Sequence, residues 1–312
     1  MSSMEKLIEI KNLCKYFSTK KSIFSKNKGI LKAVDGVSLQ IKKGETLGLV
    51  GESGCGKTTS GRAIIGLNKV TSGEMLFEGK DLAKMGMGDR RKHTKDIQMI
   101  FQDPYSSLNG RKNILNIIAE PLRNFERLSP KEELLRVQEL VARVGLSPES
   151  IYKYPHQFSG GQRQRIGIAR ALALKPKLII ADEPVSALDV SVQAQVLNFM
   201  QEIQEEFNLT YLFISHDLGI IQHMCDRIGI MYRGRFVEEG TASEIYSNPQ
   251  HVYTKRLIAA IPEMNPEKRF EKMHLRQAIN QEYQTEYNTY FDKEGRMFDL
   301  KKISETHSVA MQ

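Results

Sequence analysis

The chain has 312 residues, of which 40% are hydrophobic and 26% charged, a composition that excludes collagen-like and low-complexity disordered proteins. Its 45 Lys and Arg against 37 Asp and Glu give a net charge of +8, which fits an anionic partner such as a nucleotide, a nucleic acid or a lipid surface. Three scattered cysteines argue against a disulfide framework or a zinc site, so we expect a reducing compartment. We expect neither a secretory signal nor a membrane span, because every uncharged apolar run is far shorter than the ~18 residues a span requires.

The first part of the chain predicts three strands. Residues 5–13 alternate apolar and charged side chains, which indicates a half-buried strand. Residues 18–32 contain five lysines and no acid, and we expect them to form an exposed basic loop. Val34–Ile41 predicts a second strand, and Thr46–Val50 is a short apolar strand of the kind buried in a parallel sheet.

A glycine-rich loop follows the third strand. Gly51–Thr59 fits the pattern G-x-x-x-x-G-K-[ST] and precedes Ser60–Leu67, which predicts a helix. Glycines let backbone N–H groups converge on phosphate oxygens, and the helix N-terminus adds partial positive charge. Lys57 would reach the β- and γ-phosphates, and the Thr58 hydroxyl would bind Mg²⁺. We interpret Cys55 as a small variable residue rather than a redox switch. The predicted nucleotide-binding residues of this loop are Gly51, Glu52, Ser53, Gly54, Cys55, Gly56, Lys57, Thr58 and Thr59.

The rest of the chain alternates helices and strands. Ser129–Val144 and Val190–Phe207 predict helices, whereas Leu178–Ala181 and Thr210–Ser215 predict buried strands. This alternation indicates an α/β protein with a mostly parallel sheet covered by helices. Residues 263–312 mix both charges with aromatic residues and show little periodicity. We expect them to form a C-terminal tail, either packed on the main domain or disordered.

Two consecutive acids end the strand at 178–181. A buried strand that ends in carboxylates needs a cation or a solvent-filled site to offset their desolvation. Asp182 would hold Mg²⁺, directly or through water, and Glu183 would polarise the water that attacks the γ-phosphate. The alternative is an exposed turn before Pro184, which the upstream phosphate loop disfavours.

A second anion site is predicted at Ser159–Gln162, which precedes the amphipathic segment 163–172. The chain therefore carries two phosphate-binding devices but one phosphate loop. This combination is natural if two chains pair head to tail and each device completes the other.

These motifs, in this order, resemble those of the ABC-transporter ATPases over about residues 5–262. The matching segments are the phosphate loop at 51–59, Gln102 in FQDP, FSGGQRQR at 158–165, LIIADEP at 178–184, SALD at 186–189 and His216 in ISHD. The resemblance implies an α/β P-loop NTPase core with a mostly parallel sheet, an N-terminal antiparallel β portion and a helical subdomain at about 103–170. It implies an ABC domain at 1–262 and a tail at 263–312.

The resemblance also assigns site residues. It implies ATP and Mg²⁺ as ligands, with Thr58, Gln102 and Asp182 serving the metal. The implied catalytic residues are Glu183, His216 and Gln102. The signature residues that cap ATP across the dimer are Ser159, Gly160, Gly161 and Gln162. Asp189 would line the dimer seam. Phe17 matches the aromatic residue that stacks on adenine, and Tyr16 is a weaker alternative.

Narrower features resemble the ATPase subunits of oligopeptide and dipeptide importers, F-type. They are the basic insertion followed by LKAVDGV at 31–37, QDPYSSLN at 102–109, the extended signature region and SNPQHVYTKRLIAAIP at 247–262. Three positions depart from the usual pattern: Phe158 for Leu, Gly110 for Pro and Val252 for Pro. Some relatives carry a cysteine cluster in this region, but this sequence has no cysteine after Cys225, so we predict no iron–sulfur cluster.

The implied function is to power peptide import as a peripheral protein on the cytoplasmic face of the cell membrane. The implied partners are a second ATPase subunit, two transmembrane permease subunits and an extracytoplasmic peptide-binding protein. The resemblance favours a different chain as the second ATPase, and another copy of this chain is the alternative. An importer of another cargo, such as a metal chelate, is an open alternative. A nucleic-acid-associated ABC ATPase is disfavoured, because one phosphate loop and 131 residues between Gly51 and Asp182 (182 − 51) leave no room for a second cassette or a long coiled coil. We predict no nucleic-acid partner.

Overall fold

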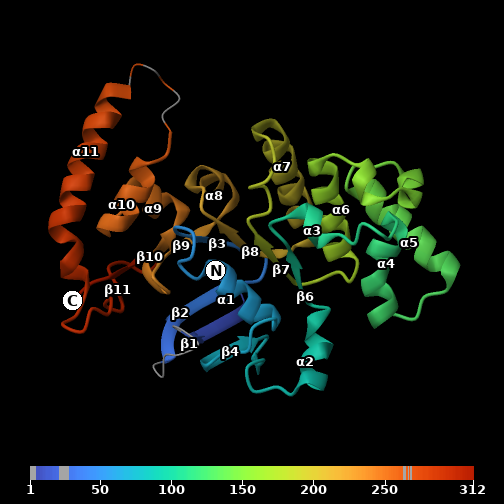
Figure 1. Ribbon diagram of the computed structural model, residues 1–312, viewed down its shortest axis with the longest axis horizontal. Coiled ribbons are helices and arrows are strands. Elements are labelled where there is room, and N and C mark those ends of the chain that lie inside the picture. Colours follow the sequence, from blue (N-terminus) through green and yellow to red (C-terminus); the bar gives the residue numbers. More distant parts are fainter. Residues whose placement is uncertain (1–4, 21–27, 263–264, 266, 268) are drawn as a thin grey trace. The chain divides into compact units, whose positions relative to one another are not determined.

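The computed structural model describes residues 5–20, 28–262, 265, 267 and 269–312 (Figure 1). The chain forms two compact units. The unit that we call the helical unit contains Met1–Glu5, Lys42–Glu45 and Lys84–Leu212. The unit that we call the sheet unit contains Lys6–Ile41, Thr46–Ala83 and Phe213–Gln312.

The first sheet of the sheet unit has the strand order β2-β1-β4-β5. Its strands are β1 Lys6–Lys20, β2 Lys28–Lys42, β4 Ser72–Phe77 and β5 Lys80–Asp81. β1 pairs antiparallel with β4, which places Ile8 opposite Phe77 and buries both side chains. The predicted N-terminal strands are therefore confirmed. The strands also extend into the segment 18–32, where we expected only a loop; residues 21–27 lie outside the described part of the chain.

The second sheet of this unit contains the strands in the order β11-β12-β10-β9-β3. They are β3 Thr46–Val50, β9 Arg227–Tyr232, β10 Arg235–Thr241, β11 Leu300–Lys302 and β12 Ser308–Ala310. β3 is buried throughout and pairs in parallel with β9, while β9, β10 and β12 pair antiparallel. β8 Thr210–Ser215 crosses the division between the units, with three residues in each.

The helices of the sheet unit begin with the one that follows the phosphate loop. They are α1 Lys57–Ile65, α8 Leu218–Met224, α9 Ala242–Ser247, α10 Val252–Ala259 and α11 Arg269–Glu286, with a short 3₁₀ helix η4 at Tyr287–Tyr290.

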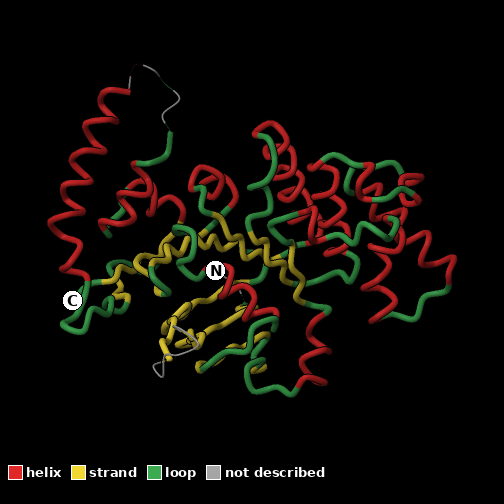
Figure 2. The backbone as a smooth tube through the Cα atoms, viewed as in Figure 1, coloured by secondary structure: helices red, strands yellow, loops and turns green. Residues whose placement is uncertain are grey.

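The helical unit is mostly helix, as the red segments of its backbone show (Figure 2). Its helices are α2 Met87–Thr94, α3 Pro104–Ser107, α4 Ile114–Phe125, α5 Pro130–Arg143, α6 Gly160–Leu172 and α7 Val190–Phe207, with short 3₁₀ turns η1 Pro148–Tyr152 and η2 Pro155–Gln157. Its strands β6 Ile97–Ile100 and β7 Leu178–Asp182 pair in parallel. The predicted helices at 129–144 and 190–207 and the predicted strand at 178–181 are confirmed. Throughout the residues that the structure describes, no helix combines the length and the apolar character needed to cross a bilayer.

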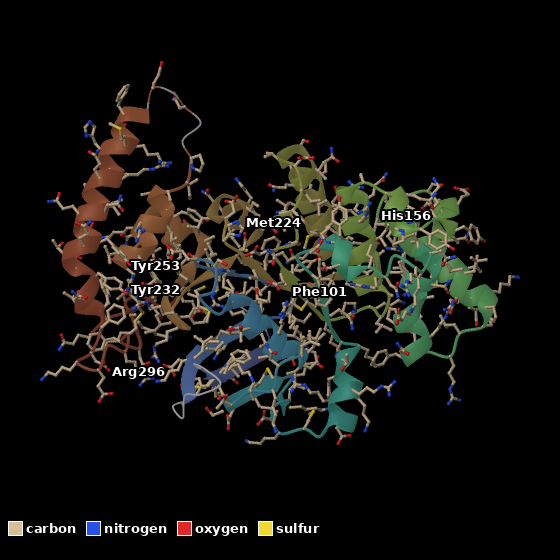
Figure 3. The ribbon with its side chains drawn as sticks, in the orientation of Figure 1. Phe101, His156, Met224, Tyr232, Tyr253 and Arg296 are labelled. Carbon is tan, nitrogen blue, oxygen red and sulfur yellow. The ribbon has the colours of Figure 1, made fainter. Side chains whose placement is uncertain are left out.

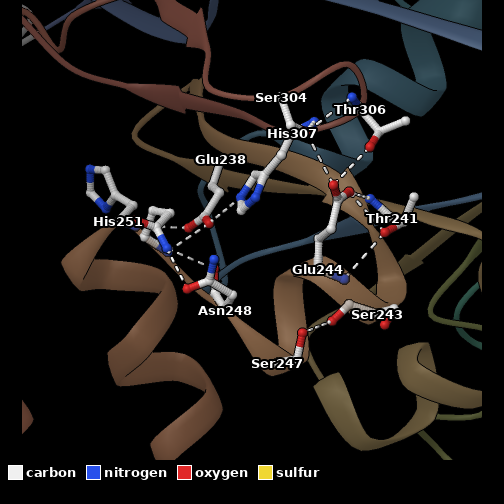
Figure 4. Close-up of polar contacts among 11 residues, drawn as sticks. Glu238, Thr241, Ser243, Glu244, Ser247, Asn248, His251, Ser304, Thr306 and His307 are labelled. Carbon is white, nitrogen blue, oxygen red and sulfur yellow. Dashed lines mark hydrogen bonds and ion pairs between the residues drawn. The ribbon is translucent and has the colours of Figure 1, made fainter.

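The C-terminal segment is attached to the sheet unit along its length. α11 lies beside α10, where Lys255 forms an ion pair with Glu282 at 2.5 Å (Figure 1). Further on, β12 adds to the edge of β10, and the ring of His307 contacts the buried carboxylate of Glu238 at 2.7 Å (Figure 4). The other oxygen of Glu238 accepts the backbone N–H of His251 at 2.9 Å. One buried acid therefore joins β10, α10 and the C-terminal segment.

Candidate nucleotide site

The loop between β3 and α1 is held in a shape that requires glycine. Gly51 and Gly56 have φ angles of 153° and 111°, in the region that side chains disfavour. A Cβ atom at Gly51 would lie 2.1 Å from the Met231 carbonyl oxygen, and one at Gly56 would lie 2.2 Å from that of Ala33. Backbone from β2 and β9 therefore approaches this loop too closely for any larger residue.

Lys57 is buried inside this loop, with 4% of its surface exposed. Its Nζ donates to the carbonyl oxygens of Gly51 at 2.6 Å and Glu52 at 3.0 Å. The Lys57 ammonium group is therefore bound to the loop at the N-terminal end of α1. Cys55 is also buried, and this burial raises the pKa of its thiol against the opposing effect of Lys57. A protonated, enclosed thiol fits the interpretation of Cys55 as a small packing residue.

The chemistry of this loop fits a nucleotide phosphate and a metal ion. Residues 52–54 of the loop are exposed, α1 contributes its positive end, and Lys57 contributes a full charge. Thr58, the second residue of α1, is half-buried and carries a hydroxyl. Hydroxyl, amide and carboxylate oxygens are ligands that Mg²⁺ accepts, and the predicted set of Thr58, Gln102 and Asp182 supplies one of each.

The acidic pair lies at the end of β7 in the helical unit. Asp182 is 1% exposed, whereas Glu183 is half-buried and adopts a φ of 46°, a left-handed conformation that costs about 1–3 kcal/mol for a non-glycine residue. Such strain persists where surrounding contacts fix the residue. Here Gln102 Nε2 donates to Glu183 Oε2 at 2.7 Å, and Ser186 Oγ donates to the Glu183 carbonyl at 3.1 Å. Two predicted catalytic residues, 81 positions apart, are therefore in direct contact.

The signature segment forms the start of α6. Ser159 Oγ accepts the Gln162 N–H at 3.3 Å, and the Gln162 side chain accepts the Ser159 N–H at 3.0 Å, which together make a capping box. Arg163 packs its guanidinium over the Tyr105 ring at 4.1 Å and donates to the Pro155 carbonyl at 2.7 Å. The predicted helix start is confirmed, and Ser159 is exposed at its tip.

The remaining predicted site residues lie on exposed positions of their units. Phe17 on β1 is 37% exposed, with Lys15 Nζ 4.6 Å from its ring centroid. Tyr16 instead donates its hydroxyl to Asp35 at 2.5 Å, which makes it the less suitable adenine platform. His216 and Asp189 are exposed after β8 and before α7, respectively.

The predicted site residues are divided between the two units. The helical unit holds Gln102, the signature, Asp182, Glu183 and Asp189; the sheet unit holds Phe17, the phosphate loop and His216.

Sequence reasoning missed one residue at the phosphate loop. Tyr253 on α10 accepts the backbone N–H of Glu52 through its hydroxyl oxygen at 3.1 Å. The only sequence signal was the segment 247–262, which resembles the peptide importers but does not indicate which part of the chain it contacts.

Comparison with known proteins places this geometry in a family. The family described as "ABC transporter" matches residues 34–186, and the family "Oligopeptide/dipeptide transporter, C-terminal region" matches residues 237–289. The chain is 50% identical to the oligopeptide transport ATP-binding protein OppF of Lactococcus lactis, over 99% of this chain and 97% of that protein. This chain belongs to the ABC transporter ATPases. It is also 52% identical to a dipeptide transport ATP-binding protein, DppF of L. lactis, over 85% of this chain and 84% of that protein.

Solved structures agree with this assignment. A dimeric ATP-binding cassette in a post-hydrolysis state, bound to ADP and phosphate, matches with a TM-score of 0.67 and 28% identity, over 75% of this chain and 98% of that one. The predicted fold class, a P-loop NTPase core with an antiparallel N-terminal portion and helices, is therefore confirmed. As an ABC ATPase, the chain binds ATP and hydrolyses it to ADP and phosphate.

Proposed function

We propose that this ABC ATPase powers the import of oligopeptides or dipeptides through a membrane transporter. The observation that carries the proposal is the match of residues 237–289 to the C-terminal region of peptide transporters. The relatives named for peptide transport add support across nearly the whole chain. Because one relative is named for oligopeptides and another for dipeptides at similar identity, peptide length is left open. A metal chelate is a second cargo to test.

In the proposed mechanism the phosphate loop binds ATP. Its amides and Lys57 offset the negative charge of the β- and γ-phosphates, and Phe17 stacks on the adenine. Glu183 orients and polarises the water that attacks the γ-phosphate. Gln102, which already contacts Glu183 at 2.7 Å, fixes the position of that carboxylate. His216 holds the γ-phosphate and the attacking water.

A magnesium ion would neutralise charge on the transferred phosphoryl group. Thr58, Gln102 and Asp182 are the residues that we propose as its ligands, directly or through water. Because the amide nitrogen of Gln102 donates to Glu183, the amide oxygen of the same side chain is the atom that would bind the metal. We propose no iron–sulfur cluster.

Two such ATPases would close around two ATP molecules. Each nucleotide would lie between the phosphate loop of one subunit and Ser159, Gly160, Gly161 and Gln162 of the other, with Asp189 at the seam. We propose that the second subunit is a different ATPase, that two permease subunits span the membrane and that an extracytoplasmic peptide-binding protein delivers the cargo. The chain would act as a peripheral protein on the cytoplasmic face of the membrane.

Glu183→Gln tests the catalytic assignment. Removing the carboxylate should slow ATP turnover by about 10²- to 10⁴-fold, the contribution typical of a general base, and should leave ATP affinity close to that of the natural protein. Steady-state phosphate release and equilibrium nucleotide binding measure the two effects. Glu205→Gln, an equal change at an exposed position of α7, is the matched control. Normal turnover of Glu183→Gln would remove Glu183 from the reaction.

Recovery of this chain from its native membranes tests the transport assignment. Two permease subunits, a second ATPase and a peptide-binding protein should co-purify, and the cargo of the binding protein then identifies the substrate. Nucleic acid or ribosomes without any membrane protein would overturn the transport assignment and leave the ATPase assignment intact.

A further inference from the structure

Tyr253 connects α10 to the phosphate loop. Its side chain is 1% exposed, and its ring lies against that of Tyr232 with centroids 4.5 Å apart (Figure 3). Its hydroxyl oxygen accepts the N–H of Glu52 at 3.1 Å, across 201 positions of sequence. Burial raises the pKa of Tyr253, so the hydroxyl is neutral at physiological pH and able to accept this hydrogen bond.

This hydrogen bond fixes one side of a particular peptide unit. The N–H that Tyr253 accepts and the carbonyl of Gly51 belong to the same peptide bond. That carbonyl accepts from Lys57 Nζ at 2.6 Å. Because the two groups of a trans peptide point in opposite directions, Tyr253 and Lys57 hold this unit from opposite sides. Glycine permits many backbone conformations, so a peptide at Gly51 needs such outside contacts to stay in one orientation.

We propose that Tyr253 is a positioning residue for ATP binding and hydrolysis: by fixing the Gly51–Glu52 peptide, it places the Lys57 ammonium for the β- and γ-phosphates. This inference rests on the phosphate-binding role that we propose for Lys57. Tyr253 acts through the loop and touches no reacting atom.

The C-terminal segment contacts Tyr232, the residue that packs against Tyr253. The hydroxyl groups of Tyr232 and Tyr287 lie 2.9 Å apart, and their rings meet edge to face with centroids 6.1 Å apart. The ring of Tyr287 in turn packs against Phe291 at 4.8 Å. A continuous row of aromatic contacts therefore runs from η4, through Tyr232 and Tyr253, to the phosphate loop. The C-terminal region that matches peptide transporters thereby gains a role in the ATPase site.

Tyr253→Phe tests the proposal, because it keeps the buried ring and removes only the hydroxyl. Loss of one neutral hydrogen bond corresponds to about a three- to tenfold change in an equilibrium constant. We expect ATP affinity of the full chain to fall by about that factor. The loss for ADP should be smaller, because Lys57 would contact both the β- and γ-phosphates of ATP and ADP has no γ-phosphate. The ratio of the two dissociation constants is the decisive readout, since a general loosening of the fold would weaken both nucleotides equally.

Two further variants control the measurement. Tyr211→Phe removes another buried hydroxyl, which contacts the Met200 carbonyl at 3.5 Å, and should change neither affinity. Tyr287→Phe removes the hydroxyl that contacts the Tyr232 hydroxyl and should shift the same ratio in the same direction by a smaller factor. It carries the test if Tyr253→Phe does not fold.

The outcomes separate this inference from the function on which it rests. An unchanged ratio for Tyr253→Phe, beside a strong loss of ATP affinity for Lys57→Ala, would overturn the role of Tyr253 alone. Unchanged ATP binding by Lys57→Ala would overturn the phosphate-binding assignment itself and this inference with it.

Discussion

The two helix N-termini that carry the predicted anion sites complete their first turns in different ways. α1 begins after Gly56, a residue without a side chain, and its first residue, Lys57, reaches back to the carbonyls of the loop. α6 begins after Ser159, whose side chain bonds the N–H of Gln162 while Gln162 bonds that of Ser159. The N-terminus of α1 has no side-chain cap, whereas that of α6 satisfies part of its backbone through its own capping box.

From this difference we expect the two helix ends to have different roles in the ATPase. The phosphate loop combines glycine, an uncapped helix end and a buried cation, so we expect it to bind nucleotide within a single chain. The N–H groups of Ser159 and Gln162 are engaged in the capping box of α6. We therefore expect the signature segment to contribute to ATP binding only when a nucleotide on another subunit replaces those internal hydrogen bonds. Loop variants should therefore change nucleotide affinity, whereas signature variants should change turnover in the assembled dimer.

Lys57→Ala should produce the largest effect on binding. It removes a charged donor from the phosphates, and hydrogen bonds to charged groups contribute about 1.5–3 kcal/mol, or roughly ten- to 150-fold in affinity. Equilibrium binding of ATP to the full chain measures this loss. Lys69→Ala, an exposed lysine of the same unit, makes the same change in net charge and should leave affinity unchanged. An equal effect of both variants would mean that total charge, rather than the loop, attracts the nucleotide.

Much of the structure around the two helix ends was predictable, because it depends on residues that are close together in the sequence. The strand at 46–50, the loop and the helix that follows are neighbours along the chain, and their periodicity and glycine spacing fix the local structure. The same holds for the strand at 178–182 and the helix at 190–207.

The C-terminal segment was not predictable in this way. β12 is placed by pairing with β10, about 70 positions earlier, and Glu238 is buried because His307 and two backbone N–H groups reach its carboxylate. Neither partner could be identified from the residues near it in sequence. The contact of Tyr253 with Glu52 was missed for the same reason, because it joins positions 201 apart.

Acid should destabilise the region that supports the phosphate loop. His251 caps α10 through its ring, which accepts the Tyr253 N–H at 3.1 Å, and it lies against Tyr290 with ring centroids 3.9 Å apart. Burial lowers the pKa of His251 from 6.5 to about 3. Below pH 6.5 the unfolded state therefore binds a proton that the folded state excludes, and the free energy of unfolding decreases by at most about 1.4 kcal/mol per pH unit.

Hydrogen exchange between pH 7 and pH 5, corrected for the intrinsic pH dependence, measures this effect locally. Protection of α10 should decrease more than protection of α6. His251→Asn keeps a side chain suited to an N-cap and removes the titrating group, so the acid-dependent difference between the helices should shrink. The same pH dependence in that variant would show that a group other than His251 causes the effect.

Ser159→Ala should have the smallest effect on stability and the most specific effect on turnover. α5 begins with a capping box of the same kind, in which Ser129 Oγ accepts the Glu132 N–H at 3.3 Å, the distance also found at Ser159. Either serine-to-alanine change should lower the free energy of unfolding by about 1 kcal/mol through the lost cap. Neither should alter ATP affinity in the single chain. In the assembled transporter, however, Ser159→Ala should slow ATP hydrolysis several-fold, because we propose that its hydroxyl binds the nucleotide of the other subunit. Ser129→Ala should hydrolyse ATP at the natural rate. Equal turnover of the two variants would show that the Ser159 side chain only caps α6. The two helix ends would still differ in their caps, but Ser159 would have no role in binding a nucleotide across the dimer.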